Sequence, residues 1–133
     1  MVCIPKKINV GAGRGGLRVF VVEDEPVIRM LVVDMIEELG CRVVAEAGDI
    51  GEAVRLAQQG DFDLAILDVN LHGEMASAAA ELIQARGLPL IFATGYGAAG
   101  LPVQFRDHAV LQKPFEIKAL AAAIDAALAS RSP

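Results

Sequence analysis

Short apolar runs alternate with amphipathic stretches over most of this chain. Each run is continuous rather than alternating, which is typical of strands that are covered on both faces of a parallel sheet. The runs predict five strands, at residues 17–23, 41–46, 64–68, 88–93 and 109–112. Because these strands alternate with helical patterns, the sequence predicts a doubly wound α/β domain.

Apolar residues between the runs recur at the spacing of one helical face. They predict four helices: one from Pro26 to Gly40, one from Asp49 to Gly60, a short one near 74–86 and one over 115–129. Asp49 and Glu52 have the spacing of a capping box at the start of the second helix. Segment 95–108 breaks the rhythm, because its first eight residues include three glycines and a proline. A shortened or irregular helix, the fourth of five, is expected there.

Polar residues stand at the ends of four predicted strands. Glu23 and Asp24 end the first strand, Asp68 closes the third, Thr94 follows the fourth and Lys113 follows the fifth. Because the carboxyl ends of parallel strands share one edge of a sheet, these side chains are expected to converge. The sequence therefore predicts a polar site on an otherwise apolar scaffold.

The groups at this edge are those that phosphoryl transfer needs. The carboxylates would hold Mg²⁺, which prefers oxygen ligands and relieves the repulsion between them. Asp68 is a candidate nucleophile, since a carboxylate can form an acyl phosphate. Lys113 would pair with one phosphoryl oxygen, and Thr94 would donate a hydrogen bond to another.

Each of these residues also has an ordinary explanation. An acid at a strand end is most often a turn or capping residue, and Thr94 alone could cap a helix. Lys113 alone would most often be a solvated lysine. It is the combination on four strands, rather than any one residue, that favours a phosphoryl-transfer site.

Composition narrows the setting of this site. With 54% hydrophobic and 22% charged residues among 133, the chain is expected to form one globular domain. No apolar run approaches the roughly 20 residues of a membrane span, and no secretory signal is visible. Cys3 and Cys41 are isolated and lack metal-ligand spacing. These features predict a cytoplasmic protein that does not bind a membrane.

The basic residues are unevenly distributed. Lys6, Lys7, Arg14 and Arg18 precede the first acidic residue, and the rest of the chain has eight basic residues against 17 acidic ones. An acidic body argues against nucleic acid as a partner. Residues 1–16 are expected to form a flexible, basic, glycine-rich leader. Its glycines match G-x-G-x-x-G, but a strand rather than a helix follows them, which argues against dinucleotide binding.

Over residues 17–130 the chain resembles the receiver domain of two-component response regulators. The resemblance rests on four motifs: Val-Val-Glu-Asp-Glu-Pro at 21–26, Leu-Asp-Val-Asn-Leu at 67–71, Ala-Thr-Gly at 93–95 and Lys-Pro-Phe at 113–115. It implies one receiver domain with a flavodoxin-like fold, in which five parallel strands have the order 2-1-3-4-5.

The resemblance also implies a role for the acidic residues. Asp68 would accept a phosphoryl group from a histidine kinase or a phosphotransfer protein. Mg²⁺ would be held by Asp24, Asp68 and the backbone carbonyl of Asn70. Glu23 would act on the ion mainly through water.

The remaining polar residues are assigned by the same resemblance. Thr94 would be the switch hydroxyl and Lys113 the phosphate-binding lysine, and the bond from Lys113 to Pro114 is often cis in this family. The spacings from Asp68 to Thr94 and from Thr94 to Lys113 are short for the family, which predicts trimmed third and fourth helices. The run 92–97 is similar to a Phe-Ala-Thr-Gly-Tyr motif of a narrower subgroup. Such receivers are frequent in alphaproteobacteria, often as single domains.

Four positions depart from the usual receiver pattern or could modulate it. Val110 stands where most receivers have an aromatic residue that swings inward, so the usual threonine–aromatic coupling is not expected. His72 stands where many have proline and is expected to be a loop residue. Tyr96 would either shield the phosphoryl group from water or pack at the output surface. Asn70 would affect dephosphorylation through its side chain, in a direction that the sequence does not give.

The functional expectation is a stand-alone receiver. Phosphorylation of Asp68 would draw in Thr94 and Lys113 and bias segment 95–108, which would change a protein-binding surface near 95–125. Two other roles stay open within the same family. One is a phosphate sink for a kinase that is shared with another receiver, and the other is a fragment of a larger hybrid kinase or regulator.

Two rival functions are less well supported. A small aspartyl phosphatase would usually have a second acid two residues after its nucleophile, where this chain has Asn70. A degenerate receiver that acts only as a binding module would be expected to lack an acid, the threonine or the lysine, and all are present. The sequence therefore predicts a signalling phosphoacceptor with Mg²⁺ as its cofactor, not an enzyme that turns over a substrate.

Overall fold

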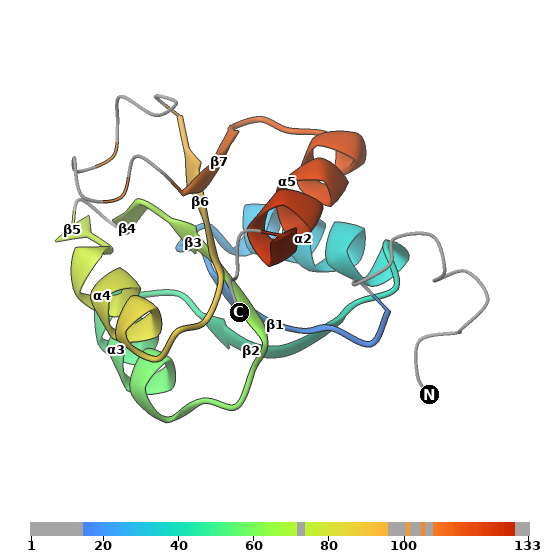
Figure 1. Ribbon diagram of the computed structural model, residues 1–133. Coiled ribbons are helices and arrows are strands. Elements are labelled where there is room, and N and C mark those ends of the chain that lie inside the picture. Colours follow the sequence, from blue (N-terminus) through green and yellow to red (C-terminus); the bar gives the residue numbers. More distant parts are fainter. Residues whose placement is uncertain (1–14, 72–73, 96–100, 102–104, 106–107, 130–133) are drawn as a thin grey trace.

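A five-stranded sheet with helices on both faces forms the centre of the molecule (Figure 1). The computed structural model describes residues 15–71, 74–95, 101, 105 and 108–129. Its elements are β1 (Arg18–Val22), α2 (Pro26–Glu38), β2 (Arg42–Ala47), α3 (Ile50–Gln59), β3 (Leu64–Asp68), β4 (Asn70–Leu71), β5 (Glu74–Met75), α4 (Ser77–Ala85), β6 (Leu90–Thr94), β7 (Ala109–Gln112) and α5 (Ile117–Ala129).

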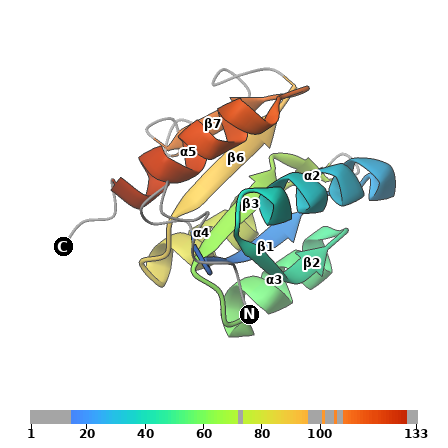
Figure 2. The ribbon, with the colours of Figure 1, turned by 90° about the vertical axis from the view of Figure 1, so that its right-hand side faces the viewer.

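All neighbouring strands of the main sheet are parallel, and their order is β2-β1-β3-β6-β7. Without the short strands β4 and β5 this is the order 2-1-3-4-5, so the predicted flavodoxin-like fold is confirmed. Helices α3 and α4 cover one face of the sheet, and α2 and α5 cover the other (Figures 1 and 2). The strand order reverses beside β1 and β3, and sheets of this kind bind ligands at the carboxyl ends of the strands near such a point.

Two apolar cores fill the space between the sheet and its helices. In β1, Phe20 and Val22 belong to the core under α3 and α4, whereas Val19 and Val21 belong to the core under α2 and α5. Successive side chains of a strand point to opposite faces. Both faces of β1 are covered, which explains why its sequence is a continuous apolar run rather than an alternating one.

The helix ends largely follow the sequence signals. Oδ1 of Asp49 accepts a hydrogen bond from the Glu52 amide at 2.9 Å, as the predicted capping box requires. The return contact differs, because the Glu52 carboxylate accepts from the Gly48 amide at 3.3 Å. Gly40 and Gly87, which follow α2 and α4, have φ values of 91° and 75°. Glycine adopts this left-handed conformation without strain, so both residues end their helices.

The third predicted helix is short, as expected, but it begins later than predicted. A helix near 74–86 was predicted, but α4 begins at Ser77 because Asn70 pairs with Met75 in a small antiparallel hairpin. The Ala76 amide then donates to the Val69 carbonyl at 2.9 Å and closes the hairpin. The helical spacing of apolar residues did not reveal this turn. The hairpin follows directly after Asp68 and therefore shapes one side of the candidate site.

Two arginines fasten the amino-terminal edge of the sheet. Arg86, which follows α4, donates to the carbonyls of Ala57 and Gly60 at 2.7 and 2.8 Å. It thereby ties the end of α4 to the end of α3. Arg18 donates to both carboxylate oxygens of Asp63, at 3.2 and 2.9 Å, and so joins the first residue of β1 to the loop before β3. Both ties lie at the edge opposite the carboxyl ends of the strands.

Several predictions fall on residues outside the described part of the chain. They include most of the leader predicted at 1–16, His72, Tyr96 and most of the irregular helix predicted within 95–108. Within that last segment, the described Phe105 is fully buried and belongs to the core under α3 and α4. Among the helices that the structure describes, none has the length and hydropathy of a membrane span.

Candidate functional site

Asp68 lies at the carboxyl end of β3, the central strand of the sheet. Every residue of β3 is buried, and Asp68 itself has 7% of its surface exposed. Its Oδ1 accepts a hydrogen bond from the Asn70 amide at 3.2 Å. Its Oδ2 accepts one from the Lys113 ammonium at 3.0 Å. The central strand therefore holds a nearly buried carboxylate whose two oxygens each have a partner.

Two further carboxylates lie beside Asp68. The Glu23 amide donates to the Ala47 carbonyl at 3.0 Å, which extends the pairing of β1 with β2 and places Glu23 and Asp24 at the sheet edge. Glu23, Asp24 and Asp68 each have a carboxylate oxygen within 4.8 Å of the others. Oxygens around one Mg²⁺ lie at most about 4.2 Å apart, because each is about 2.1 Å from the ion. The three carboxylates therefore fit such an ion with small side-chain adjustments.

Lys113 bridges this acidic group from the edge strand. Its ammonium lies 2.8 Å from Oε1 of Glu23 and 3.0 Å from Oδ2 of Asp68. Its amide donates to the Thr94 carbonyl at 2.9 Å, and the bond that follows, to Pro114, is cis. The pairing of Lys113 with a phosphoryl oxygen stays a prediction, and in this structure its ammonium is paired with the two acids.

Burial and hydrogen bonds shift the pKa values of Glu23 and Lys113. Burial raises the pKa of the Glu23 carboxyl above its usual value, although hydrogen bonds from Lys113 and the Glu25 amide act in the opposite direction. Burial alone would lower the pKa of the Lys113 ammonium. Its hydrogen bonds to Glu23 and Asp68 outweigh that effect and raise the pKa, so Lys113 stays charged at neutral pH.

Thr94 lies at the end of β6, which pairs with β3. Asp68 is opposite Ala93, so the buried Thr94 is one residue further toward the carboxyl edge. Val110 on β7 is opposite Phe92 and half-buried against the core under α3 and α4. The place where an aromatic switch residue would stand is therefore filled by a small side chain that packs on the core.

Arg29 is a residue of this site that sequence reasoning missed. It lies in the first turn of α2, and its Nη1 donates to the Glu23 carbonyl at 2.7 Å. Its Nε lies 3.2 Å from Oε1 of Glu46 on β2. Arg29 is a basic residue between apolar ones in a helix that begins directly after the two acids. That position was the available signal.

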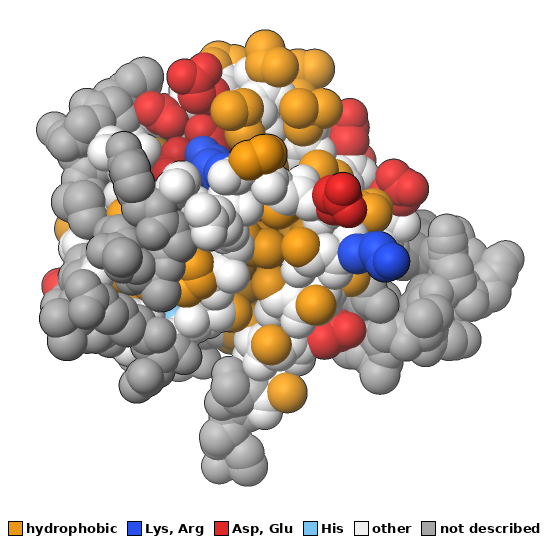
Figure 3. Space-filling view, turned by 90° about the horizontal axis from the view of Figure 1, so that it is seen from above, with side chains coloured by type: hydrophobic (Ala, Val, Ile, Leu, Met, Phe, Trp, Pro, Cys, Tyr) orange, Lys and Arg blue, Asp and Glu red, His pale blue; other side chains and the backbone are white. Residues whose placement is uncertain are grey.

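An apolar groove lies next to Lys113. It has a volume of about 360 Å³ and is lined by α2 side chains, Ile28 and Leu31 among them, and by Lys113, Pro114 and Phe115. Large apolar side chains on α2 are also exposed, namely Val27, Ile28, Met30 and Leu31. On the face seen in Figure 3, hydrophobic side chains gather beside acidic ones. The acidic site therefore borders an exposed apolar surface.

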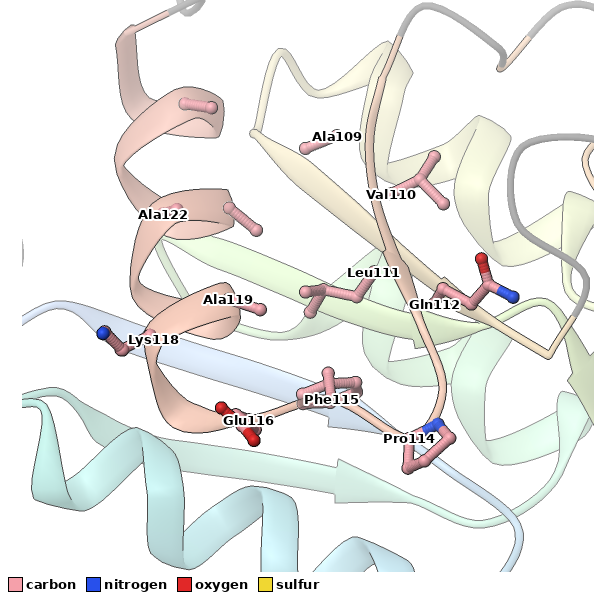
Figure 4. Close-up of a pocket in the computed structure, with 12 residues that line it drawn as sticks. Ala109, Val110, Leu111, Gln112, Pro114, Phe115, Glu116, Lys118, Ala119 and Ala122 are labelled. Carbon is pink, nitrogen blue, oxygen red and sulfur yellow. The ribbon is translucent and has the colours of Figure 1, made fainter.

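A second and wider groove lies between β7 and α5. Its volume is about 800 Å³, and its lining includes Leu111 and Phe115 as well as alanines of α5. Leu111 points toward α5, whereas Val110 and Gln112 lie on the other side of the strand (Figure 4). The alanine side chains are small and leave the groove open along the edge strand. Gln112 and Pro114, the sequence neighbours of Lys113, both line this groove.

The structure brings together most of the predicted site residues. Glu23, Asp24, Asp68 and Lys113 form one cluster, with Thr94 on the adjoining strand. The Asn70 side chain is exposed, and its amide contacts Asp68. Tyr96 is outside the described residues. A buried carboxylate that can be reached by a cation, next to a lysine and a hydroxyl, is chemically suited to forming and holding an acyl phosphate.

Comparison with known proteins identifies the family. The model of the response regulator receiver domain matches residues 19–125. The transcriptional regulatory protein PdtaR of Mycobacterium tuberculosis is 39% identical over 115 residues, which cover 84% of this chain and 56% of PdtaR. The chain therefore spans little more than half of the length of that relative.

Solved structures agree with this match. The solution structure of SdrG from Sphingomonas melonis Fr1 has a TM-score of 0.77 and 39% identity, and the alignment covers 85% of this chain and 97% of that one. The receiver domain of PhyR from Erythrobacter litoralis has a TM-score of 0.78 and 28% identity, over 90% of this chain and 95% of that one. Together with the parallel sheet and its acidic edge, these matches show that the chain belongs to the response regulator receiver domain family of two-component signalling.

Proposed function

We propose that Asp68 is the phosphoacceptor of this receiver and that a histidine kinase or a phosphotransfer protein is the donor. A carboxylate oxygen of Asp68 attacks the phosphorus atom of a phosphohistidine. The new oxygen–phosphorus bond forms as the nitrogen–phosphorus bond breaks, and the electron pair of that bond returns to the imidazole. The observation that carries the proposal is the place of Asp68, at the end of the central strand with two carboxylates within 4.8 Å and Lys113 at 3.0 Å.

Mg²⁺ is part of the proposal. Asp24, Asp68 and the backbone carbonyl of Asn70 would hold the ion, with Glu23 acting through water. When bound, it neutralises charge on the phosphoryl group during transfer. The Asp68 oxygen that now accepts from Lys113 is freed when the ammonium turns toward a phosphoryl oxygen. The hydroxyl group of Thr94 donates a hydrogen bond to another phosphoryl oxygen.

The structural effect of phosphorylation would be transmitted from the site to the edge of the sheet. Lys113 is joined to Thr94 by the hydrogen bond between their backbones, so movements of the two residues are coupled. Thr94 directly precedes the segment 95–108, and Lys113 lies between Gln112 and Pro114, which line the groove between β7 and α5. We propose that phosphorylation changes a protein-binding surface near 95–125. This change would not use the usual threonine–aromatic coupling, because residue 110 is the small Val110 and not an aromatic residue.

A phosphate-affinity gel tests the proposal. The full chain is incubated with acetyl phosphate and Mg²⁺, and a retarded band is expected for the wild type. Asp68→Asn should give no retarded band, and excess EDTA should remove the band from the wild type. Asp34→Asn, an exposed residue on α2, is the matched control and should behave as the wild type. If Asp68→Asn is still phosphorylated, the proposal fails.

Two roles of such a receiver can be separated by kinetics. An effector passes its signal to a protein target, whereas a phosphate sink drains a kinase that also serves another receiver. Phosphotransfer from that kinase, measured with and without the competing receiver, distinguishes them. A sink should accept phosphoryl groups quickly and lower the phosphorylation of its competitor. An effector should instead bind a protein target more tightly when phosphorylated.

The proposal includes the setting of the protein. The Phe-Ala-Thr-Gly-Tyr motif at 92–96 supports a place in the corresponding alphaproteobacterial subgroup. The excess of acidic residues over the body of the chain supports protein partners rather than nucleic acid. The phosphodonors would meet the chain in the cytoplasm. An alternative, that the sequence is the receiver part of a longer hybrid kinase or regulator, is tested by the boundaries of its gene.

A further inference from the structure

Arg29 connects three segments around the acidic edge. It projects from the first turn of α2 back toward the end of β1, where its Nη1 donates to the Glu23 carbonyl at 2.7 Å. On its other side its Nε lies 3.2 Å from the carboxylate of Glu46, near the end of β2. The guanidinium group of Arg29 therefore links α2, the turn at Glu23 and Asp24, and the strand β2.

The carbonyl that Arg29 holds belongs to the peptide group between Glu23 and Asp24. The next peptide group is also held, because the Glu25 amide donates to Oε2 of Glu23 at 3.1 Å. Both peptide groups that flank Asp24 thus have a fixed partner. Rotation of the Asp24 backbone would break one of these hydrogen bonds. This arrangement sets the direction in which the Asp24 carboxylate leaves the main chain.

Gly48 provides the space that Arg29 occupies. A Cβ atom at this position would lie 2.8 Å from Nη1 of Arg29 and 3.9 Å from the Glu23 carbonyl oxygen. The first distance is too short for a real contact, so any side chain here would displace the guanidinium. The φ angle of Gly48 is not in the left-handed region. Alanine at this position would therefore act through lost space and not through backbone strain.

Glu46 balances the charge of Arg29. A guanidinium near three carboxylates would by itself oppose the binding of a cation, because like charges repel. The ion pair with Glu46 offsets that charge on the side away from the site. Arg29 can therefore hold the carbonyl through a directed hydrogen bond while its electrostatic effect on a bound cation is reduced.

We propose that Arg29 is a positioning residue for the cation site and that Gly48, by having no side chain, leaves the space that the Arg29 guanidinium needs. Arg29 holds the peptide group before Asp24 so that the Asp24 carboxylate faces Glu23 and Asp68. This inference rests on the proposed function, in which that site binds Mg²⁺. When a residue that orients a metal ligand without contacting the metal is replaced, the metal affinity typically changes by about 10-fold to 100-fold.

The dissociation constant of Mg²⁺, measured by isothermal titration calorimetry on the full chain, tests this inference. Arg29→Gln and Gly48→Ala should each raise the constant by about 10-fold. Arg29→Lys keeps one donor and should lie between Arg29→Gln and the wild type. Arg42→Gln removes the same charge from an exposed position on β2 and serves as the control.

The sign of the change separates positioning from simple charge. Loss of a positive charge alone would strengthen Mg²⁺ binding, whereas loss of positioning weakens it. The double variant Arg29→Gln/Gly48→Ala should be no weaker than the worse single variant, because both substitutions remove the same contact. At saturating Mg²⁺ the phosphorylation rate of Arg29→Gln should return toward that of the wild type. A purely structural role would lower the melting temperature in EDTA and leave Mg²⁺ affinity unchanged.

Three outcomes would overturn the inference: unchanged Mg²⁺ affinity in both single variants, tighter binding in Arg29→Gln, or additive effects in the double variant. These outcomes leave phosphorylation of Asp68 in the wild type intact. If instead the wild type neither binds Mg²⁺ nor accepts phosphate from acetyl phosphate, the proposed function itself fails. The wild-type measurements therefore distinguish the two failures.

Discussion

The ammonium of Lys113, which follows β7, lies 3.0 Å from Oδ2 of Asp68 on β3, although β6 lies between these two strands. The same ammonium reaches Glu23 at 2.8 Å. Lys113 therefore offsets the repulsion between nearly buried carboxylates when no cation does so. A metal ion and a phosphoryl group would both compete with these ion pairs. Binding of either at the site would therefore act on Lys113 and, through it, on the edge strand β7.

Replacement of Lys113 should destabilise the chain most when Mg²⁺ is absent. Lys113→Met leaves Glu23 and Asp68 without their ammonium partner, and loss of one partner of a buried charged hydrogen bond costs about 1–3 kcal/mol. Urea unfolding in EDTA should show a loss of that size, and Mg²⁺ should restore part of it. Lys118→Met, at an exposed position of α5, is the control. Equal losses in the two variants would contradict the prediction.

Glu23 should make the stability of the chain depend on pH. Burial raises the pKa of its carboxyl above the usual 4.5, so between pH 4.5 and the raised value the folded chain keeps a proton that the unfolded chain has lost. The stability from this group is complete below pH 4.5 and is lost as the pH rises through the raised pKa.

Urea unfolding in EDTA from about pH 4 to about pH 7 checks this dependence. The free energy of unfolding of the wild type should fall relative to that of Glu23→Gln as the pH rises. Glu23→Gln also removes one partner of Lys113, which changes the free energy of unfolding by a constant amount. That amount does not affect the test, because the test uses how the difference between the two proteins changes with pH. A difference that stays flat, or that grows in favour of the wild type, would show that Glu23 is not the group responsible.

Thr94 should be needed for the response and not for the chemistry. Its hydroxyl is proposed to bind a phosphoryl oxygen after transfer, so Thr94→Val should still give a retarded band with acetyl phosphate. The variant should lose the change in backbone amide NMR shifts of residues 109–112 that Mg²⁺ with beryllofluoride causes in the wild type. Thr94→Ser keeps the hydroxyl and should retain that change. Loss of phosphorylation in Thr94→Val would instead place the hydroxyl in the transfer step.

Gly40 and Gly95 provide a matched pair for the backbone. A methyl group added at either Cα would meet no atom of the described residues within 4 Å, but Gly40 has a φ of 91° whereas Gly95 is outside the left-handed region. Gly40→Ala should therefore cost about 1 kcal/mol, and Gly95→Ala should be close to neutral. The two free energies of unfolding in urea check this. Similar costs would mean that φ does not decide the effect.

The sequence predicted the sheet because its signals were local and repeated. The inner strands β1, β3 and β6 are built on continuous apolar runs, whereas the edge strand β2 includes Arg42 and Glu46. The bounds of β3 and β7 are those that the sequence predicted. The convergence of Asp24, Asp68 and Lys113 followed from parallel topology. Contacts between residues that are distant in sequence could not be predicted in this way. Arg29 is the clearest case, because its partners are Glu23, which follows β1, and Glu46 on β2.

Smaller differences have equally specific causes. The hairpin at Asn70 pairs residues that also fit the start of a helical stripe, so periodicity alone assigned its second strand to the helix. The sequence predicted that Lys113 binds a phosphoryl oxygen, and it did not predict the contact between Lys113 and Glu23. Its pairing with Glu23 depends on the reach of a flexible side chain across the sheet edge, and neither spacing nor composition predicts such reach.

The ties made by Arg86 and Arg18 at the amino-terminal edge have an evolutionary consequence. Neither arginine contacts Asp68, Thr94 or Lys113 in the structure as described, and their partners come from the loops that enter β3 and from the end of α3. The contacts that fasten the scaffold and the groups of the candidate site thus lie at opposite ends of the same strands and use different residues. Natural variation can reshape the carboxyl-edge loops for new partners without loosening the sheet that carries them.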